Sequence, residues 1–287
     1  MDFTKIDLNS ADLHIHTIAS DGEMRAEEII EASEKIGLKT ISITDHDGVS
    51  AYSGGTDVLK EKAGRRGLDL IPGIELDSEY MGVEIHILGY GIDVTHPVLS
   101  EHLSEVQSLR KKRIREIMDK VNINLGEKTL TDEMIFPPGR ETLMKPHIVR
   151  ELLKNNTFNK YKDASKWIAE KCKPETIVPK LPPEVIIPVI LKAGGTPVLA
   201  HPAYYLGING IELDKKIAEL SALGLEGVEV FYDYHGLSPS MFNKKDYQGL
   251  ISMISNVTEK YGLFATRGSD SHTLEELADR NPPRLIP

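Results

Sequence analysis

Short strand-like segments and helix-like segments alternate in two separate parts of this chain. In the N-terminal third, apolar segments rich in β-branched residues predict strands at 11–15, 39–44, 68–76 and 83–90. Helical spacing between them predicts helices at 26–36 and 58–66. The alternation resumes at Gly195, with strands expected at 197–200, 225–231 and 263–266 and helices at 215–223, 239–261 and 274–278. Strands separated by helices indicate parallel βα units, and hence an α/β barrel or an open sheet.

The middle of the chain breaks this alternation. From Pro97 to about Ala193 almost every apolar pattern has helical spacing, and prolines separate the expected helices at 98–123, 148–153, 164–172 and 184–193. We interpret this stretch as an insertion. Its basic run at residues 110–115 is interpreted as a solvated helix face with intrahelical pairs to Glu105 and Glu116, or alternatively as a surface that guides substrate phosphate or RNA.

The bulk properties exclude several classes of protein. A single cysteine, Cys172, excludes a disulfide within the chain, and a reducing cytoplasm fits. Neither a secretory signal nor an apolar run near the ~20 residues of a membrane span is visible, so we expect a cytoplasmic protein without a membrane partner. The net charge of −10 argues against nonspecific binding of duplex DNA.

Metal-type ligands recur where the predicted strands end. His14 and His16 are two residues apart at the end of a strand, so both side chains can point at one metal ion. Similar side chains follow or occupy the other strands: His46, Glu75, His86, His201, Asp270 and His272. Active sites of α/β barrels are built at this carboxyl rim. Imidazole together with carboxylate favours zinc, manganese or iron over calcium or magnesium.

Read in order, DLHIHT, TDHD, PGIE, the histidine of HILGY, LAHP and GSDSH resemble the PHP (polymerase and histidinol phosphatase) phosphoesterase superfamily. The resemblance implies a distorted seven-stranded (β/α) TIM-like barrel from residues 1–97 and 194–287, with residues 98–193 as a helical insertion domain. It also implies two or three divalent metal ions (Mn²⁺, Fe²⁺ or Zn²⁺). The ligands it implies are His14, His16, Asp21, His46, Glu75, His86, His201, Asp270 and His272, with Glu75 bridging.

The expected reaction is hydrolysis of a phosphate ester. Clustered divalent metals neutralise the phosphate and lower the pKa of bound water from 15.7 toward ~7, so the expected nucleophile is a metal-bridging hydroxide. The residues expected to hold it are Glu75, His14, His16 and Asp270. Three further carboxylates, Asp12, Asp45 and Asp47, are placed either to orient ligating imidazoles or to cap loops.

The insertion resembles that of the subgroup which removes the 3′-phosphate from nucleoside 3′,5′-bisphosphates or trims short RNA from its 5′ end. That subgroup has an R-x-H-x-x-R pattern and a later K-P that bind substrate phosphate. The matching positions are Lys145, His147, Arg150 and Lys173. Lys145 keeps the charge of the usual Arg but loses its bidentate fork. An Arg often found after the HP of LAHP is also missing, since Ala203 and two tyrosines follow Pro202.

Four other residues have simpler interpretations. His235 either contacts the substrate phosphate or donates a proton, or it is a hydrogen-bonded rim residue. Arg267 is interpreted as a surface residue, and His96 and His102 as exposed.

Other functions stay open at this point. A histidinol-phosphate-type phosphatase would share the metal ligands but would need no anchor for a second phosphate. A noncatalytic nucleotide-binding module would be expected to lack ligands, and none is lost here. A proofreading exonuclease could only act as a separate subunit, and amidohydrolase chemistry fits TDHD and GSDSH less well. The expected partner is a small phosphorylated substrate.

Overall fold

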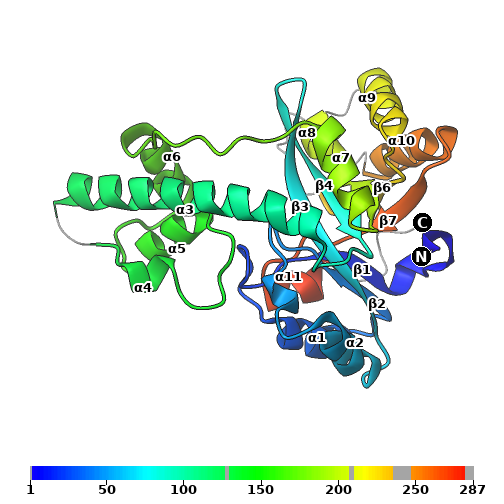
Figure 1. Cartoon of the computed structure of the whole chain (residues 1–287), viewed down its shortest axis with the longest axis horizontal. Coiled ribbons are helices and arrows are strands. Elements are labelled where there is room, and N and C mark those ends of the chain that lie inside the picture. Colours follow the sequence, from blue (N-terminus) through cyan, green and yellow to red (C-terminus); the bar gives the residue numbers. More distant parts are fainter. Residues whose placement is uncertain (1, 127–128, 207–209, 235–246, 282–287) are drawn as a thin grey trace.

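One seven-stranded sheet forms the centre of the molecule, and its strands lie in chain order (Figure 1). The computed structural model describes residues 2–126, 129–206, 210–234 and 247–281. The strands are β1 (Ala11–Ile15), β2 (Thr40–Ile43), β3 (Asp69–Tyr80), β4 (Val83–Tyr90), β5 (Thr196–Leu199), β6 (Gly227–Phe231) and β7 (Phe264–Arg267). The end of β1 pairs with the segment after β7, because the His16 amide donates to Ser271 (3.0 Å) and the Asp270 amide to His14 (2.8 Å). The sheet is therefore a nearly closed barrel, which confirms the predicted fold class.

The barrel is distorted at β4. This strand runs antiparallel to both β3 and β5, whereas the other neighbouring strands are parallel. The chain reverses through Met81 and Gly82, whose φ angles are 52° and 77°. A two-residue turn of this kind joins only antiparallel strands. The prediction of parallel units is wrong for this strand.

The third strand is longer than its sequence indicated. Pro72 and Gly73 do not interrupt it: Pro72 is in register with Ile43 of β2, and Gly73 with Tyr90 of β4. A Cβ atom on Gly73 would overlap Ser42 Oγ, so the glycine permits the close approach of β2 and β3 rather than ending the strand.

Helices cover the outside of the barrel. They are α1 (Ala26–Lys35), α2 (Thr56–Gly64), α7 (Pro183–Lys192), α8 (Pro202–Leu206), α9 (Gly210–Ala222), α10 (Tyr247–Lys260) and α11 (Leu274–Asp279). In α1, Ile29 and Ile30 are buried against Ile41 of β2, and each such side chain contributes about 1.5–3 kcal/mol. The short helix α8 has no counterpart among the predicted elements, and the first part of the helix predicted at 239–261 lies outside the described residues.

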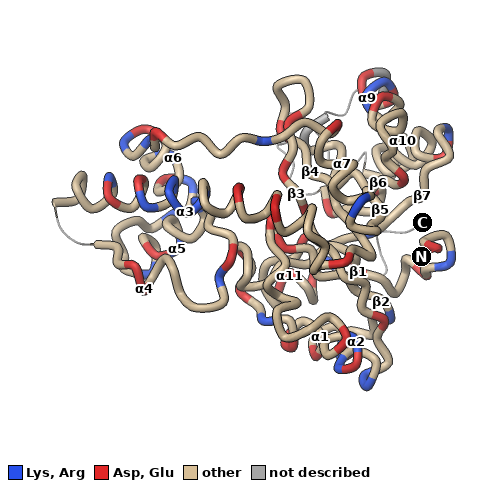
Figure 2. The backbone as a smooth tube through the Cα atoms, in the orientation of Figure 1, with Lys and Arg blue, Asp and Glu red and all other residues tan. Residues whose placement is uncertain are grey.

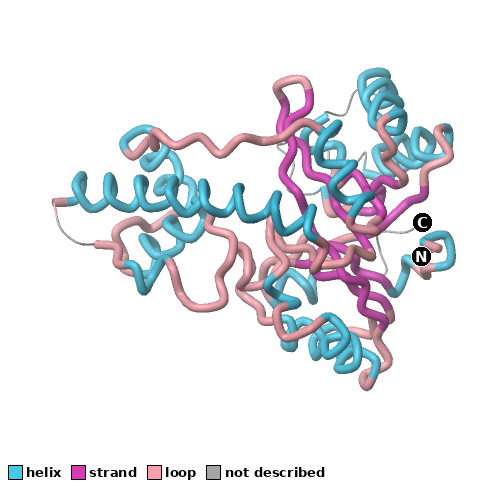
Figure 3. Tube along the Cα trace, in the orientation of Figure 1, coloured by secondary structure: helices cyan, strands magenta, loops and turns pink. Residues whose placement is uncertain are grey.

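The insertion projects away from the barrel along one long helix (Figures 1 and 3). It contains α3 (Pro97–Leu125), α4 (Asp132–Ile135), α5 (Lys145–Lys154) and α6 (Tyr161–Lys171). Its own apolar cluster includes Val121, Ile148 and Ile168, whereas Leu103 in the first half of α3 and Ile187 of α7 pack into the barrel. Long loops join α4 to α5 and α6 to α7, and each contains prolines that were expected to separate the helices.

The basic run on α3 is a solvated face only in part, with Lys111, Lys112 and Arg115 exposed. Figure 2 shows basic residues along the insertion, but Arg110 is buried and pairs with Asp47 and Asp77. Arg113 donates to the Thr176 carbonyl (2.8 Å), and Arg115 pairs with Asp132 (3.0 Å). The expected pair to Glu116 is also wrong, because Thr176 Oγ1 donates to Glu116 (2.6 Å).

Three other expectations of exposure are also wrong. Arg267 is 1% exposed and donates to the carbonyls of Leu8 (3.2 Å) and Asn9 (3.3 Å). His96 is half-buried and accepts from the Val98 amide at the start of α3 (3.3 Å), and His102 is half-buried as well. None of the helices in the described ranges combines the length and apolarity that a bilayer crossing requires.

Candidate metal centre

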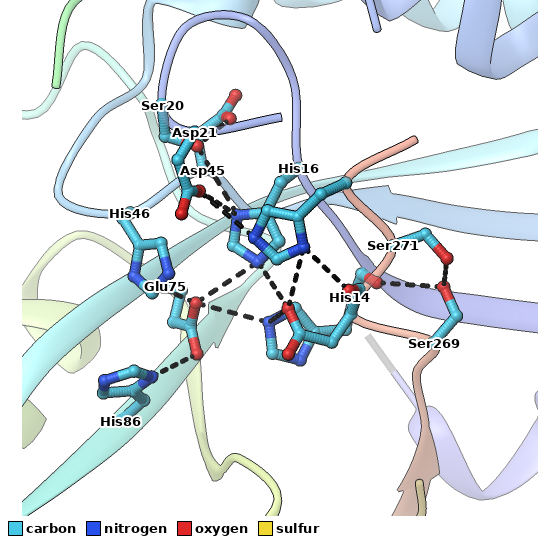
Figure 4. A network of polar contacts seen from close by, with 12 residues as sticks. His14, His16, Ser20, Asp21, Asp45, His46, Glu75, His86, Ser269 and Ser271 are labelled. Atoms are coloured by element: carbon cyan, nitrogen blue, oxygen red, sulfur yellow. Dashed lines mark hydrogen bonds and ion pairs between the residues drawn. The ribbon is translucent and has the colours of Figure 1, made fainter. Parts of the chain in front are cut away.

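The ligand-type side chains meet at the rim of the barrel (Figure 4). One comes from each of β1, β3 and β4, and the others lie in the loops that follow β1, β2, β5 and β7. His86 sits inside β4 rather than at its end because that strand is antiparallel, and its register partner is Asp77. Nine predicted ligands are brought together here: His14, His16, Asp21, His46, Glu75, His86, His201, Asp270 and His272.

Glu75 lies at the centre of this group and is fully buried. Its Oε2 atom is within 3.4 Å of three imidazole nitrogens: His14 Nε2 (3.3 Å), His16 Nε2 (3.4 Å) and His46 Nδ1 (3.1 Å). Its Oε1 atom faces His86 Nδ1 (2.8 Å) and His201 Nε2 (3.2 Å). A carboxylate with both oxygens directed at separate sets of imidazoles has the arrangement that a bridging ligand requires.

Asp270 and Asp21 face the histidines from two other loops. Asp270 Oδ1 lies 3.0 Å from His16 Nε2, and Asp21 Oδ1 lies 3.2 Å from His272 Nε2. His16, Asp21, His46 and His272 offer ligand atoms that are all within 4.8 Å of one another. The same is true of His14 with Glu75 and His201, and of His14 with His16 and Asp270.

Many of these atoms have close neighbours but no hydrogen-bond partner. Buried atoms in this state include His14 Nε2, His16 Nε2, His46 Nδ1, Asp21 Oδ1, Glu75 Oε2 and Asp77 Oδ1. Buried polar atoms are normally hydrogen-bonded, because an unmet one costs about 1–3 kcal/mol. Here imidazole nitrogens and carboxylate oxygens converge without forming good hydrogen bonds to one another. This arrangement is suited to divalent cations bound between them.

The ionisation of the cluster follows from its charges. Burial opposes the charge on Glu75, but the nearby histidines, led by His46, outweigh it and hold the pKa of Glu75 well below its usual value. Burial also disfavours protonated His46 and His272, yet carboxylates raise the pKa of each to about 9. Protons on the histidines thus neutralise the carboxylates where bound cations otherwise would.

Two of the expected ligands have unusual backbone angles. His201 has φ 26° and Asp270 has φ 52°, in the left-handed region that non-glycine residues rarely adopt. Such conformations cost on the order of 1–3 kcal/mol and persist only where the surroundings enforce them. Here Tyr232 donates to Asp270 Oδ2 (2.9 Å) and Arg280 donates to the Asp270 carbonyl (3.0 Å), which holds the aspartate toward the cluster.

Glu229 supports the cluster and was not predicted. It is fully buried in β6, faces His14 Nδ1 through Oε1 (3.0 Å) and accepts from the His201 amide through Oε2 (2.8 Å). One carboxylate therefore fixes the ring of one expected ligand and the backbone of another. The only signal in the sequence is an acidic residue inside an otherwise apolar strand.

The three carboxylates expected either to orient imidazoles or to cap loops accept their hydrogen bonds from groups other than the imidazoles. Asp12 accepts from the amide (2.9 Å) and hydroxyl (2.6 Å) of Ser269, and Asp45 accepts from the amide (2.8 Å) and hydroxyl (2.6 Å) of Thr17. Asp47 accepts from Arg110 Nε (3.0 Å). They stabilise the ligand-bearing loops through backbone, hydroxyl and guanidinium groups.

Two of the residues expected to bind phosphate contact the loop that carries Asp21. His147 Nε2 donates to the Ser20 carbonyl (2.8 Å), and its Nδ1 accepts from the Met144 amide (3.0 Å). Burial and the nearby Arg140 lower the pKa of His147 to about 4, so this imidazole is neutral. Arg150 NH1 donates to the Asp21 carbonyl.

The other three phosphate-binding candidates stay predictions. Lys145 and Lys173 are both exposed, and the Lys173 carbonyl accepts from Lys120 on the distal half of α3 (2.7 Å). His235 lies outside the described residues.

A pocket of about 260 Å³ opens directly on the cluster. Its wall includes Glu75 and Asp270 together with two aromatic residues, Tyr204 and Tyr232, whose rings meet edge to face at 5.6 Å. The pocket therefore joins candidate metal ligands to an aromatic surface.

Residues 12–178, more than half of the chain, match the PHP domain family. The chain belongs to this family. The expected resemblance is confirmed, and the protein is a metal-dependent phosphoesterase and hence a hydrolase.

Two relatives in sequence span both the barrel and the insertion. The 5′-3′ exoribonuclease Rnm of Escherichia coli is 29% identical over 265 residues, covering 91% of this chain and 84% of that protein. The 3′,5′-nucleoside bisphosphate phosphatase of Chromobacterium violaceum is 25% identical over 262 residues, covering 91% of this chain and 86% of that protein.

Solved structures have the same fold. A protein from Chromobacterium violaceum described as an amidohydrolase, with bound sulfate and no metal, has a TM-score of 0.75 and 24% identity over 92% of this chain and 88% of that one. A second, from Bifidobacterium adolescentis and described as a metal-dependent phosphoesterase, has a TM-score of 0.72 and 22% identity over 91% of this chain and 87% of that one.

Proposed function

We propose that this PHP-family enzyme hydrolyses phosphate monoesters of nucleotides. Its substrates would be nucleoside 3′,5′-bisphosphates, which lose the 3′-phosphate, and/or short 5′-phosphorylated RNA, which would be trimmed from its 5′ end by cleavage of a phosphodiester. The observation that carries this proposal is the match of barrel and insertion together, over 91% of the chain, to relatives named for these two substrates. A phosphatase without a second-phosphate anchor would need no such insertion.

The proposed reaction uses the cluster around Glu75. Two or three bound divalent ions (Mn²⁺, Fe²⁺ or Zn²⁺) would neutralise the phosphate and activate water as the nucleophile. The chain itself supplies the nine ligands and keeps them in place. Glu229 and Tyr232 orient His14 and Asp270, respectively. The bound ions and their ligands would then hold the substrate phosphate next to the attacking water, so that the reaction does not depend on a chance encounter.

The nucleoside part of the substrate fits the aromatic side of the pocket. Tyr204 and Tyr232 border the same space as Glu75 and Asp270. Aromatic faces bind nucleobases without strong sequence preference, which suits both a mononucleotide and a short RNA.

A second phosphate would bind on the insertion side. Arg140, Arg150 and Lys154 line a further pocket of about 260 Å³ together with Gly22, next to the Asp21 loop. Glu23 and Glu151 also line it, which leaves a net charge of +1 among these side chains. We propose that Arg150 has two roles, supporting the Asp21 loop and attracting this phosphate, while Lys145, Lys173 and His235 remain candidates for further contacts.

The test is hydrolysis by the manganese-loaded protein, measured as phosphate release from the monoesters and as release of nucleoside 5′-monophosphate from RNA. Adenosine 3′,5′-bisphosphate and a 5′-phosphorylated RNA trimer would be compared with adenosine 5′-monophosphate and histidinol phosphate. Preference for the first two, lost in a His14→Ala, His16→Ala double variant, supports the proposal. Preference for histidinol phosphate would contradict the nucleotide assignment. Absence of release from all four by metal-loaded protein would favour the noncatalytic nucleotide-binding module.

A matched variant tests the second-phosphate pocket. Lys154→Met removes one cation of this pocket and lies outside the metal cluster. We expect it to raise KM for the bisphosphate several-fold and to leave hydrolysis of p-nitrophenyl phosphate, which has a single phosphate, unchanged. Equal effects on both substrates would contradict this location.

A further inference from the structure

Two buried aspartates share one arginine beside the metal cluster. Arg110 of α3 donates to Asp47 Oδ2 through Nε (3.0 Å) and to Asp77 Oδ2 through NH2 (2.7 Å). Asp47 is 1% exposed and Asp77 is 9% exposed. Both belong to the barrel, so the arginine ties the insertion to the rim where the expected ligands lie.

The second oxygen of each aspartate distinguishes the two residues. Asp47 Oδ1 accepts from the Asp77 amide (3.2 Å), so both of its oxygens are used. Asp77 Oδ1 has no hydrogen-bond partner, although it lies 3.2 Å from His46 Nδ1 and 3.6 Å from His86 Nε2. His46 Nδ1 likewise has no partner in hydrogen-bond geometry. These two atoms are close but not aligned, as expected when both point at a common third position.

The separations fit a metal ion. Ligand bonds of 2.0–2.2 Å in a tetrahedral site place neighbouring ligand atoms about 3.4 Å apart. The distances of 3.2 Å and 3.6 Å bracket this value, and His46, Asp77 and His86 offer ligand atoms within 4.8 Å of one another. Glu84 Oε1 also lies 3.2 Å from His86 Nε2, at the exposed side of the group.

We propose that Asp77 is an additional metal ligand, whose Oδ1 atom holds a divalent cation together with His46 and His86. This inference rests on the metal-dependent activity proposed above and adds a ligand that the nine positions of the resemblance do not include. Arg110 and Lys180, whose ammonium lies 3.8 Å from Asp77 Oδ2, occupy the other oxygen and so fix which one faces the histidines.

The competing explanation is a purely structural ion pair. In that case Asp77 would serve only to neutralise Arg110, and it would be equivalent to Asp47. The two aspartates therefore provide a matched pair of variants, Asp77→Asn and Asp47→Asn. Each removes one carboxylate charge from the same arginine at a buried position, but only the first removes a charged oxygen that faces imidazoles.

The experiment measures binding of Mn²⁺ to the full-length metal-free protein by calorimetry, with bound metal counted by mass spectrometry. We expect Asp77→Asn to weaken the weakest Mn²⁺ site at least tenfold, or to remove one bound ion, whereas Asp47→Asn, which alters only the support of the His46 loop, should have a clearly smaller effect and retain every bound ion. The Tm of the metal-free protein should be lowered by a similar amount in both variants. If Asp77→Asn does not fold, Asp77→Glu, which keeps the charge but displaces the oxygen, should show the same weakening.

Two outcomes overturn the inference. Unchanged Mn²⁺ binding by the folded Asp77 variants would do so, as would an equal loss in the Asp77 and Asp47 variants. Failure of the wild-type protein to bind Mn²⁺ at all would instead contradict the metal centre, and hence the proposed function itself.

Discussion

Replacing Glu229 with glutamine should weaken metal binding although Glu229 is not itself an expected ligand. Its two oxygens serve two different acceptor roles, one toward His14 Nδ1 (3.0 Å) and one toward the His201 amide (2.8 Å). Glutamine has the same shape but only one acceptor oxygen, and its NH₂ group is a donor. A metal ion on His14 Nε2 would keep the ring proton on Nδ1, so Glu229→Gln would then leave one of these donors facing another donor.

The magnitude follows from burial. Glu229 and His14 are both fully buried, so water cannot replace the lost partner. An unmet buried donor costs about 1–3 kcal/mol, which should appear as a lower free energy of unfolding in the metal-free protein. Loss of a carboxylate that orients a ligating imidazole typically weakens metal affinity about 10–100-fold. The variant should therefore be folded but less stable, and it should need a higher Mn²⁺ concentration for saturation.

The assay combines urea unfolding of the metal-free protein with Mn²⁺ titration. Glu226→Gln is the control, because Glu226 precedes the same strand but is exposed. We expect a change of less than 0.5 kcal/mol for the control, as for most surface substitutions. Wild-type Mn²⁺ affinity in a destabilised Glu229→Gln protein would refute the orienting role, leaving Glu229 as a structural residue only.

Three further perturbations have defined outcomes. Gly268→Ala should lower stability by about 1–3 kcal/mol and reduce metal content, because its Cβ would overlap His14 Cβ and Glu229 Oε1; a stable, fully loaded variant would contradict the packing. The pKa of His147 is lowered from 6.5 to about 4, so its contribution is complete above pH 6.5 and is lost as the pH falls toward 4. Between pH 7 and pH 5 wild type should lose about 2 kcal/mol more than His147→Gln in urea unfolding, and parallel pH profiles would contradict this. Removing metal with EDTA should lower Tm by roughly 5–10 °C and Mn²⁺ should restore it, whereas a Tm insensitive to both would contradict tight binding.

Most of the expected ligands could be found from the sequence because they belong to short patterns at strand ends, whereas Asp21 was identified only through the family resemblance. His14 and His16 share a face by their spacing of two. The same rule applies to Glu75 and Asp77 on β3, although only Glu75 was predicted. The predicted strands at 68–76 and 83–90 are separated by only six residues, and a connection this short already excludes a parallel crossover.

Contacts between distant segments could not be predicted in this way. Glu229 reaches His14 across 215 positions, and Arg110 reaches Asp47 across 63. No local pattern marks such partners, because a buried Glu or Arg is tolerated only where the folded chain supplies the opposite group. The basic run on α3 illustrates the difficulty, since its composition is that of a surface helix while one member enters the rim.

The insertion braces the barrel rim at two places, through His147 and Arg150 on the Asp21 loop and through Arg110 on Asp47 and Asp77. Excising it would therefore not yield a minimal catalyst with broader substrate range, because the carboxylates would lose their counter-charges along with the cap. Exchange of insertions between family members, by evolution or by design, has to carry the matching rim loops with it. Substrate specificity and metal binding therefore depend on the same contacts and would change together when the insertion is exchanged.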